Sequence, residues 1–211
     1  MQLSFKNILV LAPHTDDGEL GAGATINRLV DEGATVHYVA FSICAQSLPA
    51  GLAPDTLAHE CSAATQILGI KKENLTLLDY DVRYFPENRQ PILEDLVKLN
   101  KKIQPDLVLL PNSQDIHQDH QTIHQESVRA FKNTTIWGYE LPWNNTSFSG
   151  NTFVTVSEQQ LHTKIEALTK YYSQSHRSYM NADFIRGLAM VRGIQAGSLY
   201  AEAFEFIRMK I

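Results

Sequence analysis

The sequence has little cysteine, no long apolar run and no excess of positive charge, and each absence excludes a class of protein. Its two cysteines among 211 residues, Cys44 and Cys61, have a spacing that fits no zinc or redox motif. We therefore expect two reduced, buried thiols in a cytoplasmic protein. Residues 1–7 lack the charged, apolar and cleavage regions of a signal peptide. No apolar segment approaches the roughly 18 residues of a membrane-spanning helix, so we expect no membrane span.

The balance of charge gives no electrostatic reason to expect nucleic acid or an anionic membrane as a partner, because the formal net charge is −5. Hydrophobic residues make up 44% and charged residues 19% of the chain, which is ordinary for a globular protein with a sizeable core. There is no internal repeat, low-complexity segment or linker, so we expect one domain over residues 1–211. A small molecule is the expected partner, and a homo-oligomer is compatible with this composition.

Apolar runs typical of buried strands alternate with segments of helical periodicity along most of the chain. The predicted strands cover residues 6–12, 35–41, 74–78, 106–111, 134–139, 152–156 and 203–207. The predicted helices cover residues 19–32, 55–68, 92–103, 118–131, 157–172 and a segment from 182 onward. Parallel neighbours need helix-length crossovers, so the alternation predicts an α/β fold with a mainly parallel sheet and helices on both faces.

A histidine and two adjacent carboxylates follow the first predicted strand. The strand stops at Pro13, and the loop behind it carries His14, Asp16 and Asp17. In open α/β sheets, ligands bind outside the carboxyl ends of the strands, which is where this loop lies. Taken alone, the two aspartates are also compatible with a cap on the following helix.

A second polar cluster follows the predicted strand 106–111, which also ends in a proline. Its members are Asp115, His117, Asp119, His120 and His124. Because both clusters follow strands of one parallel sheet, we expect them to meet at one edge of that sheet. Imidazoles and a carboxylate from two loops can hold a divalent metal, and three protein ligands plus water is the arrangement of a catalytic zinc. A fourth protein ligand would exclude that water, so we expect His124 to be structural or solvated.

These two clusters resemble the motifs of a known family. Residues 13–19 (Pro-His-Thr-Asp-Asp-Gly-Glu) are similar to the Pro-His-x-Asp-Asp-x-Glu signature of the LmbE-like, or PIG-L, zinc-dependent N-deacetylases. Residues 117–120 (His-Gln-Asp-His) are similar to their His-x-Asp-His motif, and Ser173-Gln174 and residues 200–204 match more weakly. The resemblance covers nearly the whole chain. It implies a Rossmann-like, three-layer α/β/α fold and removal of the N-acetyl group from an amino sugar or its conjugate, such as a glycan, a nucleotide-sugar or a small-thiol precursor.

The resemblance also implies a set of metal ligands that spacing alone leaves open, namely His14, Asp17 and His120 on Zn²⁺. Another divalent metal is compatible with the same residues. Asp16 is next to a ligand without being one in the family scheme, which makes it the general base for the metal-bound water.

Two further residues of the second cluster complete the expected machinery. We expect a protonated His117 to stabilise the oxyanion that develops on the amide. We expect the Asp119 carboxylate to hold His117 by a hydrogen bond and to favour its charged form. The alternative for Asp119 is a residue at the start of a helix that makes only backbone hydrogen bonds.

The residues that bind the rest of the substrate are less clearly marked. Several family members carry an arginine at the start of the helix after the second strand, but residues 55–60 contain none. Arg83, in the loop after strand 74–78, is a candidate replacement; the alternative is a surface arginine that packs on its aromatic neighbours. Glu140, Trp143 and Asn144 follow another strand and are candidates for a sugar pocket, because aromatic rings stack on sugars and polar side chains bond their hydroxyl groups.

Two competing functions fit the sequence less well. A dinucleotide-binding oxidoreductase is suggested by the glycines after the first strand, but residues 21–26 lack the third glycine of Gly-x-Gly-x-x-Gly. The acidic loop before them would also repel a pyrophosphate. A noncatalytic sugar-binding module would not need the intact set of His14, Asp16, Asp17 and His120. The sequence therefore predicts a zinc-dependent N-deacetylase.

Overall fold

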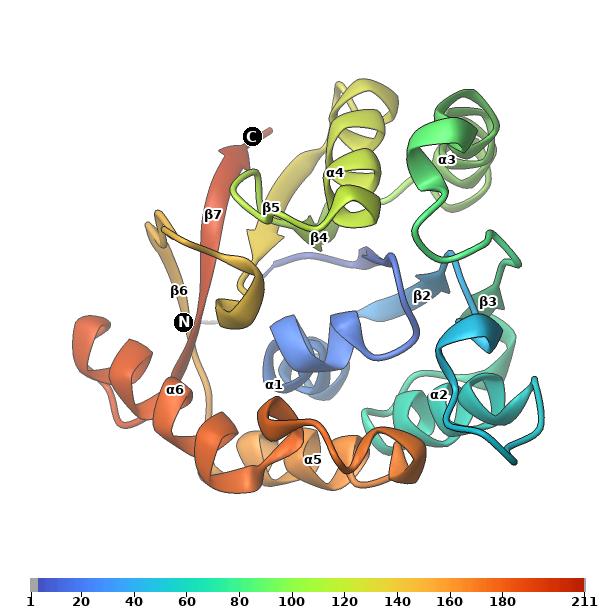
Figure 1. The fold of residues 1–211 in the computed structure, drawn as a ribbon. Coiled ribbons are helices and arrows are strands. Elements are labelled where there is room, and N and C mark those ends of the chain that lie inside the picture. Colours follow the sequence, from blue (N-terminus) through green and yellow to red (C-terminus); the bar gives the residue numbers. More distant parts are fainter. Residues whose placement is uncertain (1–3, 211) are drawn as a thin grey trace.

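The computed structural model describes residues 4–210 and contains a seven-stranded sheet between two layers of helices (Figure 1). Residues 1–3 and 211, which the predicted single domain includes, lie outside the described residues. The strands are β1 (Asn7–Ala12), β2 (Thr35–Ala40), β3 (Leu75–Leu77), β4 (Leu107–Pro111), β5 (Thr135–Tyr139), β6 (Thr152–Thr155) and β7 (Ala201–Arg208). The helices are α1 (Asp17–Asp31), α2 (Thr56–Ile67), α3 (Arg89–Ile103), α4 (Gln118–Ala130), α5 (Glu158–Leu168) and α6 (Ala182–Gln195).

The strand order is β3-β2-β1-β4-β5-β7-β6, and the first five strands in that order are parallel. The predicted α/β fold with a mainly parallel sheet is therefore confirmed. After β1, strands β2 and β3 are added toward one edge of the sheet. The chain then returns to the other side of β1, where β4 and β5 are added toward the opposite edge. The carboxyl ends of β1 and β4 thus form the switch point at which α/β sheets bind ligands.

The last strand, β7, lies between β5 and β6 and is antiparallel to both. The pattern of the sequence predicts a strand near this point but not its insertion between two earlier strands. Among residues 4–210, no helix has the length and apolar character needed to cross a membrane.

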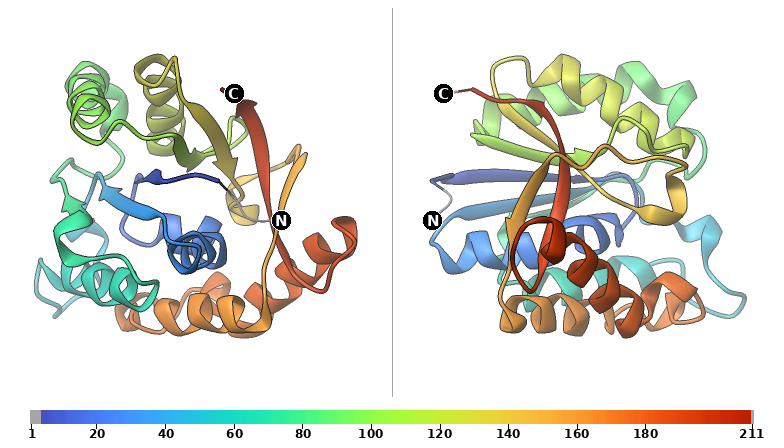
Figure 2. Two further views of the ribbon diagram at one scale, coloured as in Figure 1. Left: turned by 180° about the vertical axis from the view of Figure 1, so that it is seen from behind. Right: turned by 90° about the vertical axis from the view of Figure 1, so that its left-hand side faces the viewer.

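The sheet is buried on both faces, and the side chains of β1 show how. Ile8, Val10 and Ala12 pack in the core beneath α1, α2 and α5, whereas Leu9 and Leu11 pack in a second core with α3 and α4. All five are fully buried, as expected where helices cover both faces of a parallel sheet. The two helical layers are visible on either side of the strands in Figure 2.

Helix α1 is interrupted at Ala22, whose backbone (φ −144°, ψ 15°) is not helical. Just after the break, Ala24 and Thr25 donate their backbone N–H groups to the Glu202 carboxylate of β7, at 3.2 and 2.7 Å. Lys164 of α5 donates to Glu202 at 2.6 Å and to the carbonyl of Leu20 at 2.7 Å. A buried ion pair from two other elements therefore holds both halves of α1, and the first half carries the acidic loop.

The substitution Glu202→Ala would leave Lys164 as a buried charge without its carboxylate and two N–H groups of α1 uncapped. Breaking a buried pair in this way costs about 3–5 kcal/mol, so the free energy of unfolding should fall by about that amount in urea titrations. The control Glu158→Ala removes an exposed ion pair with Arg186 and should shift the unfolding midpoint little. Equal shifts for both variants would contradict the role assigned to Glu202.

Candidate metal and active site

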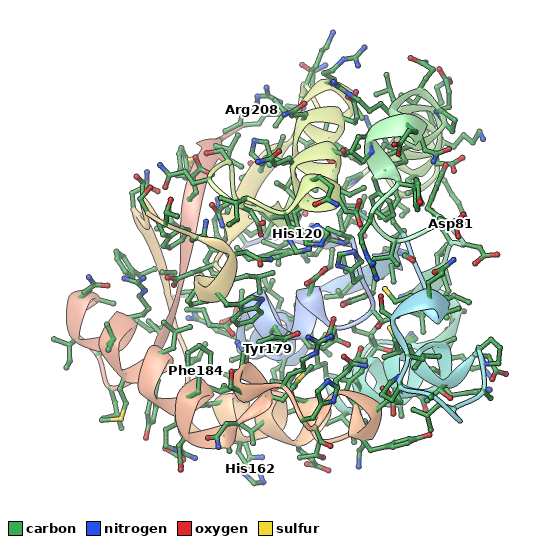
Figure 3. The ribbon with its side chains drawn as sticks, in the orientation of Figure 1. Asp81, His120, His162, Tyr179, Phe184 and Arg208 are labelled. Atoms are coloured by element: carbon green, nitrogen blue, oxygen red, sulfur yellow. The ribbon has the colours of Figure 1, made fainter. Side chains whose placement is uncertain are left out.

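The candidate site is a cavity of about 340 Å³ at the carboxyl ends of the five parallel strands. The loop after each of these strands contributes side chains to its wall, and the segment between α5 and α6 closes another side. Figure 3 shows two of these residues, His120 at the start of α4 and Tyr179 on the segment that precedes α6. The two polar clusters of the sequence therefore meet at one sheet edge, as predicted.

Three side-chain atoms at the base of the cavity lie at nearly equal distances from one another. His14 Nδ1 is 3.1 Å from Asp17 Oδ2, His120 Nε2 is 3.2 Å from the same oxygen, and the two nitrogens are 3.2 Å apart. Ligands of a tetrahedral zinc at its usual bond lengths are about 3.3 Å from one another. These three atoms can therefore hold one ion of that size with little rearrangement.

Each of the two histidines is oriented from behind by a carboxylate. Asp115 Oδ2 lies 2.7 Å from His120 Nδ1, and Asp119 Oδ2 lies 3.0 Å from His14 Nε2. Such contacts fix the ring that carries them and leave the other nitrogen free for a metal. The role of Asp115 was not expected from the sequence. Asp119 does orient a histidine, but the predicted partner is wrong: its carboxylate contacts His14 and not His117.

His117 belongs to the same group, since one ring nitrogen from each of His14, His117 and His120 lies within 4.8 Å of the others. His117 Nδ1 accepts a hydrogen bond from the backbone N–H of Asp119 at 3.2 Å, so the neutral ring carries its hydrogen on Nε2. Burial, with the nearby His120 and His14, lowers the pKa of His117 to about 4. In the metal-free protein this favours a neutral His117 over the expected protonated one, and the role of His117 at the amide oxygen stays a prediction.

Asp16 lines the cavity and does not cap the helix. It occupies the position before α1, yet its side chain makes no capping hydrogen bond. Burial and the neighbouring carboxylate of Asp17 raise the pKa of Asp16 to about 6. Asp17 behaves differently: burial alone would raise its pKa, but His120 and His14 hold it well below the usual range. Adjacent carboxylates with separated pKa values are suited to separate roles.

The loop that carries these aspartates is fixed by a buried cluster beneath it. The hydroxyls of Tyr38 and Tyr171 lie 3.0 and 2.6 Å from the carbonyl oxygen of Thr15, and both also contact the carboxyl group of Glu19. Burial raises the pKa of Glu19 to about 8, so at neutral pH it is mostly protonated and can also donate a hydrogen bond. Glu19, the last residue of the first motif, therefore helps to hold the loop that carries Asp16 and Asp17.

The structure places three of the four substrate-binding candidates in the cavity wall, namely Arg83, Trp143 and Asn144. The prediction that Glu140 lines the sugar pocket is wrong. Glu140 lies away from the cavity, and its buried carboxylate is paired with Arg192 of α6, with one contact at 2.9 Å. His124 is structural, as expected, because its Nδ1 lies 2.9 Å from the carbonyl oxygen of Pro111.

Several lining residues were not singled out from the sequence. Gln174, Arg177 and Tyr179 come from the segment after α5, where Ser173-Gln174 was the one available signal. Ser173 is held there by buried Glu60, which accepts from its N–H at 2.9 Å and from its hydroxyl at 2.7 Å. Cys44 also lines the cavity, but burial raises the pKa of its thiol to about 12, so it is not a nucleophile at neutral pH.

Comparison with known proteins now decides the family. The model of the family described as PIG-L, GlcNAc-PI de-N-acetylase, matches residues 9–131, more than half of the chain. The deacetylase YaiS of Escherichia coli K12, which carries the description "uncharacterized", is 31% identical over 80% of this chain and 91% of its own length. This chain belongs to the PIG-L family. The predicted relationship to LmbE-like N-deacetylases is thereby confirmed.

More distant relatives extend the comparison over nearly the whole chain. Diacetylchitobiose deacetylase of Thermococcus kodakarensis is 25% identical over 96% of this chain and 83% of its own length. The N,N'-diacetylchitobiose deacetylase structure from Pyrococcus horikoshii has a TM-score of 0.83 at 23% identity, covering 97% of this chain and 84% of that one. The structure of GalB, a 4-carboxy-2-hydroxymuconate hydratase from Pseudomonas putida KT2440, has a TM-score of 0.77 at 19% identity over 98% of both chains. The fold alone therefore does not identify the reaction.

We expect Asp115→Asn to weaken zinc binding about 10- to 100-fold, because His120 would lose the charged partner that orients it. Competition with a chromophoric chelator measures the change. Asp95→Asn, on α3 and bonded to Tyr80 and Lys98, is the matched control and should leave zinc affinity unchanged. An unchanged affinity in Asp115→Asn would show that its contact with His120 does not support metal binding.

Zinc affinity of the metal-free protein should rise with pH. Burial opposes the charged form of His120, but Asp17 and Asp115 outweigh it and raise the pKa of His120 to about 10. The free protein therefore holds this proton at pH 6 to 8, and the proton must leave before the nitrogen can bind a metal. Because the pKa of His14 is also raised, chelator competition at pH 6, 7 and 8 should show an affinity that grows at least tenfold per pH unit. A flat profile would contradict a proton on His120 in the free protein.

Proposed function

We propose that this protein is a zinc-dependent hydrolase that removes the N-acetyl group from an N-acetyl amino sugar or its conjugate. The observation that carries the proposal is the nearly equilateral arrangement of His14 Nδ1, Asp17 Oδ2 and His120 Nε2 beside the carboxylate of Asp16. Membership of the PIG-L family and the deacetylase relatives support the reaction type.

In this proposal His14, Asp17 and His120 hold the metal, and Asp115 and Asp119 keep the two imidazoles in position. When bound, zinc would polarise both a water molecule and the amide carbonyl. The donor set of two imidazoles and one carboxylate fits zinc and leaves a position open for water. Other divalent metals remain compatible with these ligands.

Asp16 and His117 act on the reacting atoms. The Asp16 carboxylate takes the proton of the attacking water and delivers it to the departing amine nitrogen, which completes hydrolysis of the C–N bond. A carboxylate with a pKa raised toward neutrality is suited to both transfers. The Nε2–H of neutral His117 donates a hydrogen bond to the amide oxygen as negative charge develops there.

The wall of the cavity is suited to a sugar ring. Trp143 and Tyr179 stack with ring centroids 4.1 Å apart and planes 11° from parallel, which gives one wall an aromatic surface. Asn144 and Gln174 supply amide groups for sugar hydroxyls. A volume of about 340 Å³ is at the small end of ligand pockets, so the cavity encloses about one sugar unit and leaves the attached group at its mouth.

The remaining expectations stay predictions. These are the single domain over residues 1–211, the cytoplasmic location and a homo-oligomeric assembly. A noncatalytic sugar-binding module is separated from the proposed enzyme by turnover, since it would bind such sugars without releasing acetate.

The decisive experiment measures acetate released from a panel of N-acetyl amino sugars, free and nucleotide-linked, by the zinc-loaded protein. We expect Asp16→Asn to retain zinc and to lose about 10²- to 10⁴-fold in kcat, because the general base is removed while the ligands remain. His120→Ala should lose both zinc and activity, and chelation should abolish turnover by the unmodified chain. Full activity in Asp16→Asn would exclude it as the base, and chelator-insensitive acetate release would exclude the metal mechanism.

A further inference from the structure

Exposed apolar side chains gather on α6, the helix at the outer edge of the molecule (Figure 1). Of the nine large hydrophobic side chains that are exposed among residues 4–210, four belong to α6 or to the turn that follows it. They are Met190 (43% exposed), Val191 (52%), Ile194 (78%) and Leu199 (66%). Single exposed apolar residues are common on protein surfaces, whereas a contiguous group of them marks an interaction site.

The spacing of these residues places them on one side of the helix. Residues three and four apart are neighbours on a helix surface. The positions that share this side are Gly187, Met190, Val191 and Ile194. After the helix, the N–H of Ser198 donates to the carbonyl of Gly193 at 2.9 Å, so the chain turns back and Leu199 follows beside the same helix end. We call these four positions together with Leu199 the α6 face.

The α6 face carries no charge. Within residues 184–201 the charged residues are Arg186 and Arg192, and both form ion pairs with carboxylates of their own chain, Glu158 and Glu140. The side of a helix that faces water normally carries charged and polar residues. A helix that lies on a membrane carries lysine and arginine on its polar side to meet anionic lipids. The face is therefore suited to a protein surface rather than to water or a membrane.

The shape of the α6 face is complementary to itself. At Gly187 a Cβ atom would meet nothing within 4 Å, so this position is an open gap in the face. Ile194, the most exposed of its side chains, lies two turns further along the helix. In an antiparallel pair of α6 helices with the two-fold axis between Met190 and Val191, each Ile194 lies over the Gly187 of the other chain. Such an isologous contact is the kind that two-fold dimers use.

The exposed apolar area of the α6 face also fits an interface between two chains. From the exposed fractions, its four large side chains present together about 400 Å². Each partner in a standard interface contributes about 800 Å², of which about 57% is non-polar. The four side chains therefore supply nearly the whole apolar part of one such interface.

We infer that the α6 face is covered by a second copy of this chain, in a two-fold dimer with antiparallel α6 helices. None of the residues of the face lines the cavity, so the pairing leaves the candidate active site open. The first turn of α6 carries Phe184, whose ring centroid lies 6.2 Å from that of Trp143, and Tyr179 precedes the helix (Figure 3). The dimer therefore also holds the helix that supports the aromatic wall of the cavity.

Sedimentation velocity of the full chain over a range of concentrations tests the inference. We expect a species with the mass of two chains. Ile194→Lys should raise its dissociation constant at least 100-fold, because the dimer would bury two unpaired charges. Met209→Lys, at the other end of β7 and 55% exposed, is the matched control and should leave the constant unchanged. If further interfaces build a larger assembly, Ile194→Lys should halve its mass, since every two-fold pair would be lost.

A second variant tests the antiparallel arrangement and does not risk the fold. Gly187→Leu meets no neighbour in the single chain and replaces glycine with a better helix former, so circular dichroism should show a folded protein. The larger side chain should nevertheless weaken the dimer at least tenfold, because it fills the gap that receives Ile194. Gly187→Ala should weaken it less.

Three results would count against the inference. A mass of one chain at every concentration would overturn it and leave the α6 face to a different protein or to a lipid surface. A dissociation constant that Ile194→Lys leaves unchanged would place the contact between chains elsewhere and would also overturn it. Tighter association of Gly187→Leu would show general apolar attraction and would overturn the antiparallel arrangement.

Discussion

One carboxylate oxygen joins the two halves of the site. Asp17 Oδ2 accepts a hydrogen bond from the backbone N–H of His14 at 2.8 Å and lies within 3.2 Å of nitrogens on both His14 and His120. The first two residues come from the end of β1 and the third from the helix after β4. The parallel pairing of β1 with β4 brings these ends together, so the site depends directly on the topology of the sheet.

Buried glutamates hold the irregular segments around this oxygen. Glu19 supports the loop before α1, Glu60 anchors the turn after α5, and Glu202 satisfies the break in α1. Loops that carry function lack a ladder of backbone hydrogen bonds, and each of these acids supplies fixed partners instead. Because all three are buried, removing one leaves polar groups without partners, and that is more costly than the loss of a surface contact. The geometry of the site therefore depends on these buried glutamates, although they do not contact the substrate.

The parts of the molecule that could be predicted are those encoded locally. The strand before His14 and the strand before Asp115 were visible as apolar runs ending at proline, and their parallel order placed both clusters at one edge. Which side chains pair with one another could not be predicted, because this depends on packing between segments that are distant in the sequence. Asp119 faces His14 rather than the adjacent His117, and Glu140 is paired with Arg192, 52 residues further along the chain. Arg177 itself carried no signal, and the weak match at Ser173-Gln174 was the one indication that the chain returns to the cavity in this segment.

The break in α1 has a consequence for the order in which the protein can acquire its structure. Thr25 lies 177 residues before its partner Glu202, which is most of the length of the 211-residue chain. Contacts between such distant residues form only after the intervening chain has been closed into a loop, and they slow folding. During synthesis, the acidic loop near the amino end therefore leaves the ribosome long before the strand that stabilises the helix beneath it. Maturation of the site is thus coupled to completion of the sheet by β7 rather than to folding of the first βα unit.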